Sequence, residues 1–164
     1  MQARPAQPGD VREIARIYNE GIEDRLATFE TRKRTEDDVR LWFDGRHPII
    51  VVEEDDGRII AFASSHAYDA RECYAGVAEA SVYVDRSGRR RKAGHVALQA
   101  LIDQCRSRGF WKLVGRIFPE NTASRALVGA LDFREVGTHR FHSRLDGEWK
   151  DVIVVERLIR ENLK

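Results

Sequence analysis

Net charge is nearly absent from this sequence, which balances 28 basic residues against 27 acidic ones and carries a formal charge of +1 at pH 7. Proteins dedicated to binding DNA carry a basic excess, so this balance argues against a nucleic-acid partner. Long apolar runs are missing too, because the longest, HPIIVV and RIIAFASS, are far too short to cross a bilayer. No charged segment followed by an apolar one opens the chain, so nothing indicates secretion. We therefore expect neither nucleic acid nor a membrane as a partner.

Cysteine is scarce as well, since only Cys73 and Cys105 occur. Their separation does not match the spacing of metal-binding cysteines. A low number of cysteines is typical of proteins in a reducing compartment, so we expect a cytoplasmic protein. The five histidines share no ligand spacing, and no metal site is predicted. Repeats, linkers and low-complexity segments are also missing. With 164 residues, the chain is long enough for one domain, residues 1–164, with a core of ordinary size.

The sequence does contain a regular succession of strand-like and helix-like segments. Asp10 and Glu13 have the spacing of a capping box, and apolar residues follow at helical intervals. The predicted helices cover residues 10–22, 35–43, 96–109 and 121–131, the single strands 76–84 and 112–118, and the hairpins 49–67 and 134–159. The order β-α-α-β-β-β-α-β-α-β-β predicts an α/β fold, a mixed sheet with helices on its faces.

The most unusual segment is SVYVDRSGRRRKAGHVAL, residues 81–98, in which a cluster of basic residues separates a strand from a helix. A helix N-terminus has unpaired N–H groups and a partial positive charge, and it binds phosphate readily. Arginine side chains near it would add charge-assisted hydrogen bonds. A solvated surface turn would have the same composition, so the loop alone leaves both interpretations open. Nucleic-acid binding is disfavoured because no aromatic residues alternate with the charges to stack on bases.

This segment resembles the acetyl-coenzyme A loop of the GCN5-related N-acetyltransferases, in which Gln/Arg-x-x-Gly-x-Gly/Ala follows a strand. Here the pattern falls on Arg89-Arg90-Arg91-Lys92-Ala93-Gly94. ENTASRALVGALDF is similar to the second hallmark of that family, Asn-x-x-Ser followed by Ala-Leu-Gly-Phe/Tyr. TFET, RECYAGVAEASVYV and RLDGEWKDVIVVERLI resemble segments of its phosphinothricin and methionine sulfoximine acetyltransferase branch. RLDGEWKDV is closest to the arsinothricin-resistance enzymes, and the resemblance covers nearly the whole chain.

The resemblance implies a GCN5-related N-acetyltransferase fold, with a mixed, mostly antiparallel central sheet flanked by helices. It implies an enzyme that uses acetyl-coenzyme A as co-substrate and acetylates the α-amino group of a small glutamate-like amino acid: phosphinothricin, methionine sulfoximine or arsinothricin. Acetylation would remove the charged amine that such a toxin needs, and so give resistance. The resemblance also implies a homodimer. Two other functions stay open: an acyl-coenzyme A-binding module with weakened catalysis, and an acetyltransferase for another small amine.

For the acceptor site, Glu79 occupies the position that resembles the branch's catalytic glutamate. A base is needed because an ammonium group has no lone pair with which to attack. The other interpretation of Glu79 is a strand carboxylate paired with an arginine. Arg71 and Tyr74 match the branch's substrate-carboxylate residues, and the other interpretation of them is a mobile surface loop. Phe29 and Thr31, in TFET, resemble the other wall of the acceptor pocket, which a partner subunit would help to form.

For acetyl-coenzyme A, the resemblance implies that backbone N–H groups from Val82 to Val84 polarise the thioester carbonyl and hold the pantetheine arm. Asn121 would bind that arm, cap its own helix, or do both. Phe133 stands where many relatives have a tyrosine, so no general acid is predicted. The expected contacts of acetyl-coenzyme A are Val82, Tyr83, Val84, Arg89, Arg90, Arg91, Lys92, Ala93, Gly94, His95 and Asn121.

Lys92 departs from the family pattern, because it stands where the acetyl-coenzyme A loop has its first glycine. A residue with a side chain costs about 1–2 kcal/mol there if the turn is left-handed, which is about tenfold in affinity. A lysine ammonium beside a pyrophosphate would offset part of that cost. We therefore expect a loop that is weakened but still able to bind.

Overall fold

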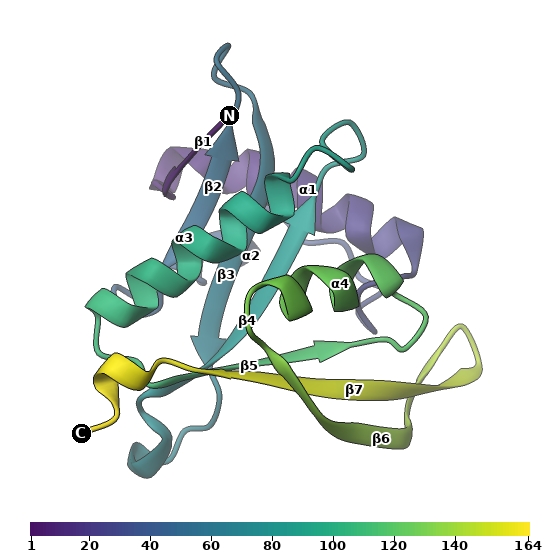
Figure 1. The fold of residues 1–164 in the computed structure, drawn as a ribbon. Coiled ribbons are helices and arrows are strands. Elements are labelled where there is room, and N and C mark those ends of the chain that lie inside the picture. Colours follow the sequence, from purple (N-terminus) through teal and green to yellow (C-terminus); the bar gives the residue numbers. More distant parts are fainter.

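A seven-stranded sheet forms the centre of the computed structural model, which describes all 164 residues (Figure 1). Its strand order is β1-β2-β3-β4-β5-β7-β6, and every neighbouring pair is antiparallel except β4 and β5, which are parallel. The strands are β1 Gln2–Pro5, β2 Ile49–Glu53, β3 Ile59–Ala67, β4 Val77–Val84, β5 Lys112–Ile117, β6 Arg134–Leu145 and β7 Glu148–Leu158. The predicted α/β fold with a mostly antiparallel sheet is therefore confirmed.

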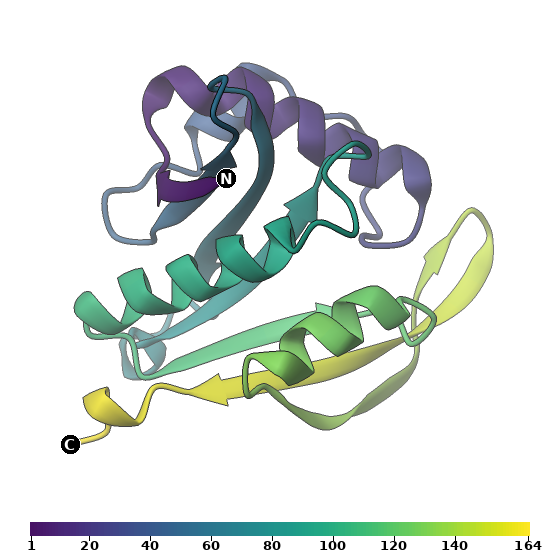
Figure 2. The same cartoon turned by 45° about the horizontal axis from the view of Figure 1, so that its top comes forward.

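Helices cover both faces of this sheet (Figure 2). One apolar core lies between the sheet and the pair α3 and α4, and a second lies between the sheet and the pair α1 and α2. The helices are α1 Val11–Asp24, α2 Glu36–Arg40, α3 Ala93–Ser107 and α4 Thr122–Ala130, with short 3-10 turns at Pro8–Asp10, Glu72–Tyr74 and Arg160–Asn162. None of these helices has the length and apolar character that a membrane crossing requires.

Most boundaries follow local signals in the sequence. Asn121 caps α4 as predicted, since its side chain accepts a hydrogen bond from the Ser124 N–H at 3.2 Å. The last hairpin turns at Asp146 and Gly147, whose φ values of 50° and 82° suit a two-residue turn. The helix predicted over residues 35–43 is shorter, because α2 ends at Arg40. The strand that opens the predicted order is β1, a short segment whose partner β2 is distant in sequence.

The parallel pair β4 and β5 is unusually short. Only Val77–Glu79 pair with Lys112–Val114, although β4 continues to Val84 and stays paired with β3 along its other edge. Beyond Glu79 the two strands diverge, and α4 lies over the opening (Figures 1 and 2). We call this opening between β4 and β5 the gap.

The gap exposes hydrogen-bonding groups of β4. Just after this strand, the Asp85 N–H donates to the Ile60 carbonyl of β3 at 2.8 Å. Backbone groups alternate in direction along a strand, so the N–H groups of Val82 and Val84 point the other way, into the gap. The sheet thus has a free edge in its middle.

Candidate functional site

Three connected cavities meet at the gap. The smallest, about 70 Å³, lies between Ala80–Tyr83 of β4 and Gly115–Ile117 of β5. On one side it shares Asn121 with a cavity of about 560 Å³ beside the basic loop, which we call the loop cavity. On the other side it shares Arg116 with a cavity of about 600 Å³, which we call the polar cavity. Tyr83 lines all three, so the cavities adjoin in a row from the basic loop, past the gap, to the polar cavity, and we call this row of cavities the passage.

The loop cavity is bounded by the start of α3 and by the basic loop before it. Lys92 is the N-cap of α3 and has φ 64° and ψ 14°, so the turn is left-handed at this position. Arg90 is left-handed as well, with φ 62°. The Val96 N–H donates to the Lys92 carbonyl at 3.1 Å, so the amides before Val96 have no partner within the helix. These free N–H groups face a cavity with positive side chains, an arrangement that suits a phosphate.

Gly94 brings α3 close to the sheet. A Cβ atom at this position would lie 3.3 Å from the side chain of Val84 and 3.2 Å from that of Leu127. Both neighbours would have to move to accept a side chain. The last glycine of the predicted pattern therefore serves close packing, while Lys92 carries the left-handed turn.

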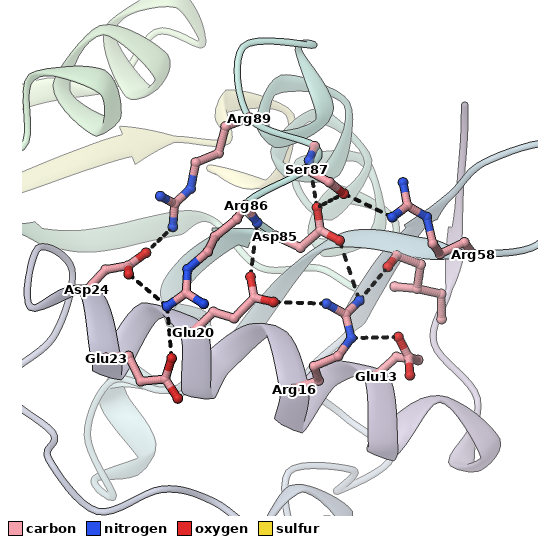
Figure 3. Close-up of polar contacts among 12 residues, drawn as sticks. Glu13, Arg16, Glu20, Glu23, Asp24, Arg58, Asp85, Arg86, Ser87 and Arg89 are labelled. Carbon is pink, nitrogen blue, oxygen red and sulfur yellow. Dashed lines mark hydrogen bonds and ion pairs between the residues drawn. The ribbon is translucent and has the colours of Figure 1, made fainter.

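Two arginines of the loop are engaged by carboxylates at the end of α1 (Figure 3). Arg86 pairs with Glu23 at 2.8 Å and with Asp24 at 3.0 Å, and Arg89 also pairs with Asp24. The Arg86 N–H donates to Glu20 at 2.9 Å. Arg89, and then Arg86, hold the pKa of Asp24 below its usual range. The loop is thus held against α1 by the protein's own charges.

The other basic residues of the loop differ in whether their side chains form ion pairs within the chain. Arg91 pairs with Glu54 at 2.5 Å and does not line the loop cavity. Arg90 and Lys92 line it and form no ion pair within the chain. Of the residues expected to contact acetyl-coenzyme A, all except Arg91 line this one cavity: Val82, Tyr83, Val84, Arg89, Arg90, Lys92, Ala93, Gly94, His95 and Asn121.

Asp85 fixes the base of the loop. It is buried, and its Oδ1 accepts hydrogen bonds from the Gly88 N–H at 2.6 Å and from the Ser87 hydroxyl at 2.9 Å. Its Oδ2 lies 3.5 Å from the guanidinium of Arg16, which also pairs with Glu20 at 3.1 Å (Figure 3). The start of the loop therefore has a defined position before any ligand binds.

Residues that lie directly opposite each other on β3 and β4 line the polar cavity: Ser64 and Ser81, His66 and Glu79, and also Tyr83, whose opposite residue Phe62 is buried and outside the lining. Alternate residues share one face of a sheet, so the pairs lie side by side, about 6.6–6.8 Å apart along the strands. The aromatic pair stacks with its ring centroids 5.4 Å apart. Burial raises the pKa of Tyr83, whose phenol stays uncharged. This wall of the cavity thus runs from the Tyr83 ring through a hydroxyl pair to an ionisable pair.

Glu79 is part of this ionisable pair, and its side chain is 28% exposed. Its closest charged partner is Arg116 of β5, at 3.4 Å, whose own side chain is half exposed. That distance is too long for a well-formed charge-assisted hydrogen bond. The alternative interpretation of Glu79, a carboxylate paired with an arginine, is supported only by this long contact with Arg116. Most of its hydrogen-bonding capacity stays available to a ligand.

The residues predicted to bind the acceptor do not all reach the polar cavity. Phe29 lines it. Thr31 is exposed and lies outside the lining. Arg71 and Tyr74 follow β3 in the connection to β4 and also lie outside the lining, and the Arg71 side chain is 69% exposed. Within one chain, the structure places only Phe29 in the same cavity as Glu79.

Other residues of the polar cavity were not predicted from the sequence. Arg34, Trp42, His66 and Arg116 all line it. The edge of the Trp42 ring meets the His66 ring at a centroid distance of 5.5 Å. Burial lowers the pKa of His66, whose imidazole is therefore neutral near pH 7. Alternation along β3 marks which face His66 occupies, but its pairing with Glu79 depends on a register that no local pattern reveals.

Known proteins resemble this chain along most of its length. Residues 13–133 match the model of the Acetyltransferase (GNAT) family. The phosphinothricin N-acetyltransferase of Streptomyces coelicolor is 28% identical over 163 residues, which cover 96% of this chain and 95% of that protein. The L-methionine sulfoximine/L-methionine sulfone acetyltransferase of Pseudomonas paraeruginosa is 29% identical over 157 residues, covering 93% and 91%. The crystal structure of a phosphinothricin acetyltransferase from Sinorhizobium meliloti in complex with AcCoA matches with a TM-score of 0.89 and 27% identity, covering 96% and 87%.

Proposed function

Because the chain belongs to the GNAT family of acetyltransferases, we propose that it transfers an acetyl group from acetyl-coenzyme A to the α-amino group of a small amino acid. The observation that carries this proposal is the passage through the gap, which joins a loop suited to phosphate with a cavity that holds a carboxylate. Two reactants can enter from opposite sides of the sheet and meet between β4 and β5. The 164 residues would act as one catalytic domain.

The residues along the passage fit acetyl-coenzyme A. The free N–H groups at the start of α3, with Lys92 and Arg90, suit its pyrophosphate. The N–H groups of Val82 and Val84 suit a pantetheine arm that lies in the gap like an added strand. The Asn121 side chain already caps α4 and donates to the Leu26 carbonyl at 3.2 Å. We therefore assign Asn121 to shaping the passage, with any contact to the arm as a further role.

Glu79 would accept a proton from the acceptor's ammonium group, directly or through water, and leave a neutral amine. The amine nitrogen would then bond to the thioester carbonyl carbon, while N–H groups from Val82 to Val84 stabilise the negative oxygen. The nitrogen then gives its second proton to water, the carbon–sulfur bond breaks and the thiolate leaves. A thiol pKa of about 8.5 makes this departure feasible without a dedicated acid. That agrees with Phe133, which is buried in the core and has no hydroxyl.

The acceptor that we propose is glutamate-like: phosphinothricin, methionine sulfoximine or arsinothricin. Relatives that match nearly the whole chain are named for the first two compounds. Arg34 and Arg116 line the polar cavity and offer positive charge to a carboxylate. Arg34 is already paired with Glu30 at 2.8 Å, so Arg116 is the freer of the two. Acetylation would remove the positive charge of the toxin's amine and give resistance.

A homodimer would reconcile the proposed roles of Arg71 and Tyr74 with their place outside the polar cavity. The Arg71 guanidinium lies 4.9 Å from the centre of the Tyr74 ring, so the two side chains are presented together. Phe141 of β6 and Trp149 of β7 are 64% and 52% exposed, an apolar surface that a second copy could cover. In such a dimer, the loop of one copy would reach the cavity of the other.

The test is thiol release from acetyl-coenzyme A across a panel of amino acids that includes phosphinothricin, methionine sulfoximine and arsinothricin. We expect release with a glutamate-like compound at a kcat/KM about tenfold or more above that for ordinary amino acids, since one charged hydrogen bond alone supplies that factor. No release with any amine, together with intact binding of acetyl-coenzyme A by calorimetry, would refute the proposal. The protein would then be an acyl-coenzyme A-binding module.

A further inference from the structure

His66 and Glu79 face the polar cavity as one pair. They lie directly opposite each other on β3 and β4, and both line the cavity. Residues directly opposite on neighbouring strands have their Cβ atoms about 4.5–5.5 Å apart. Two side chains placed so closely on one face can both reach a single small group above them.

The surroundings of His66 hold its ring in one orientation. Its Nε2 lies 3.3 Å from the Ser64 hydroxyl, and the Trp42 ring packs against it edge to face. Ser64 is 2% exposed, and its hydroxyl makes no other hydrogen bond. When Nε2–H donates to Ser64, Nδ1 keeps its lone pair. The neutral ring is then an acceptor next to the Glu79 carboxylate.

We propose that His66 binds the amino group of the acceptor together with Glu79 and so helps to select and orient the amine. An ammonium group has several N–H bonds, so the carboxylate and the imidazole can each accept one. After Glu79 has taken a proton, the hydrogen bond to His66 would keep the amine in place while its lone pair turns to the carbonyl carbon. The inference rests on the proposed acetyl transfer, and it adds a positioning residue to that site.

Burial and the charged groups around His66 determine the pH below which its ring is protonated and can no longer accept a hydrogen bond from the amine. Burial and, to a smaller extent, His47 lower its pKa, whereas Glu79 and Asp44 raise it. The other ionisable residues that line the cavity are Tyr18, Glu30, Arg34, Tyr83, Arg116 and His142. The net direction is downward, so His66 takes up its proton only below its ordinary range. That proton removes the lone pair and places a positive charge beside the ammonium, so the KM for the acceptor should rise as the pH falls.

Two variants separate hydrogen bonding from ionisation. His66→Leu loses both, and we expect the KM for the amino acid to rise about tenfold, since a hydrogen bond to a charged group is lost. His66→Gln keeps an acceptor oxygen, so its KM should stay within about threefold of the wild type, with the rise at acid pH reduced. The KM for acetyl-coenzyme A should be unchanged in both. His139→Gln, an exposed histidine outside the cavity, is the matched control.

The kinetics should be followed from about pH 5 to pH 8, where histidine titrates. Wild-type KM values in His66→Leu, or a wild-type rise at acid pH in His66→Gln, would overturn the inference. Calorimetry with methionine sulfoximine tests the same pair without turnover. Binding that the wild type has and His66→Leu loses would support the pair even if no acetyl transfer occurs and the proposed function fails. Equal binding by both proteins, or no binding by the wild type, would overturn it.

Discussion

Replacing Lys92 by glycine should have opposite effects on stability and on affinity. Lys92 is exposed and holds φ 64°, a conformation that costs a residue with a side chain about 1–2 kcal/mol. Glycine removes that cost but loses about 0.5–1 kcal/mol more backbone entropy on folding. The net gain is up to about 1.5 kcal/mol, which for a chain of this size raises the Tm by up to about 3–6 °C.

The affinity for acetyl-coenzyme A should fall in the same variant. An ammonium about 4 Å from a phosphate in water contributes about 1 kcal/mol, so Lys92→Gly should raise the Kd about fivefold at low salt. The difference should shrink at about 1 M salt, where the Debye length is near 3 Å. Lys92→Met is the matched control, because it removes the charge and keeps the left-handed side chain. It should show the same loss of affinity without the gain in Tm.

Calorimetric titration at two salt concentrations, with thermal melts of the three proteins, measures both effects. Binding by Lys92→Gly as tight as that of the wild type at low salt would mean that the ammonium does not meet a phosphate. Equal Tm values for the glycine and methionine variants would mean that the strain at Lys92 is no larger than the backbone entropy that glycine costs. Either result would refute half of the reasoning and leave the other half standing.

Four further predictions concern individual side chains. Glu79→Gln should lower kcat about 100-fold with an unchanged Kd for acetyl-coenzyme A, and a wild-type pH–rate profile in this variant would contradict its role as base. Arg116→Gln should raise the KM for the amino acid about tenfold, and Arg71→Ala should do so only if the proposed dimer forms; equal effects on both substrates would indicate a structural role instead. Burial raises the pKa of Cys105 to about 12, whereas Cys73 is exposed, so iodoacetamide at about pH 8 should label Cys73 alone in the folded protein; mass spectrometry of the labelled peptides checks this, and labelling of Cys105 without unfolding would contradict it.

Features that depend on neighbouring residues could be predicted from the sequence. Asn121 caps its helix through a bond three residues on, and the turn at Asp146 and Gly147 follows from its own residues. The loop pattern predicts a cost at Lys92 only if the turn there is left-handed, and the structure has it left-handed. The roles of Glu79 and of the loop residues toward ligands stay predictions.

Features that depend on long-range register or pairing could not be predicted. His66 meets Glu79 because β3 and β4 pair in one register among several that their residues would allow. Arg86 and Arg89 are basic residues beside a phosphate-binding pattern, yet their partners Glu23 and Asp24 lie more than sixty positions away. The neighbouring sequence does not distinguish an arginine that is free to bind a phosphate from one that is paired with a carboxylate of the same chain.

The short pairing between β4 and β5 has a consequence for stability. Three residue pairs join β4 to β5, with two further backbone hydrogen bonds to the Gly76 carbonyl just before β4, so the backbone bonding between β1–β4 and β5–β7 is confined to one end of these strands. A ligand that fills the gap would bridge β4 and β5 and act as the missing strand between them. Saturation at about 100 times its Kd would add about 2.7 kcal/mol to the unfolding free energy, and amide exchange at Val82 and Val84 would slow. Release of the product would then leave the N–H groups of Val82 and Val84 without a partner again.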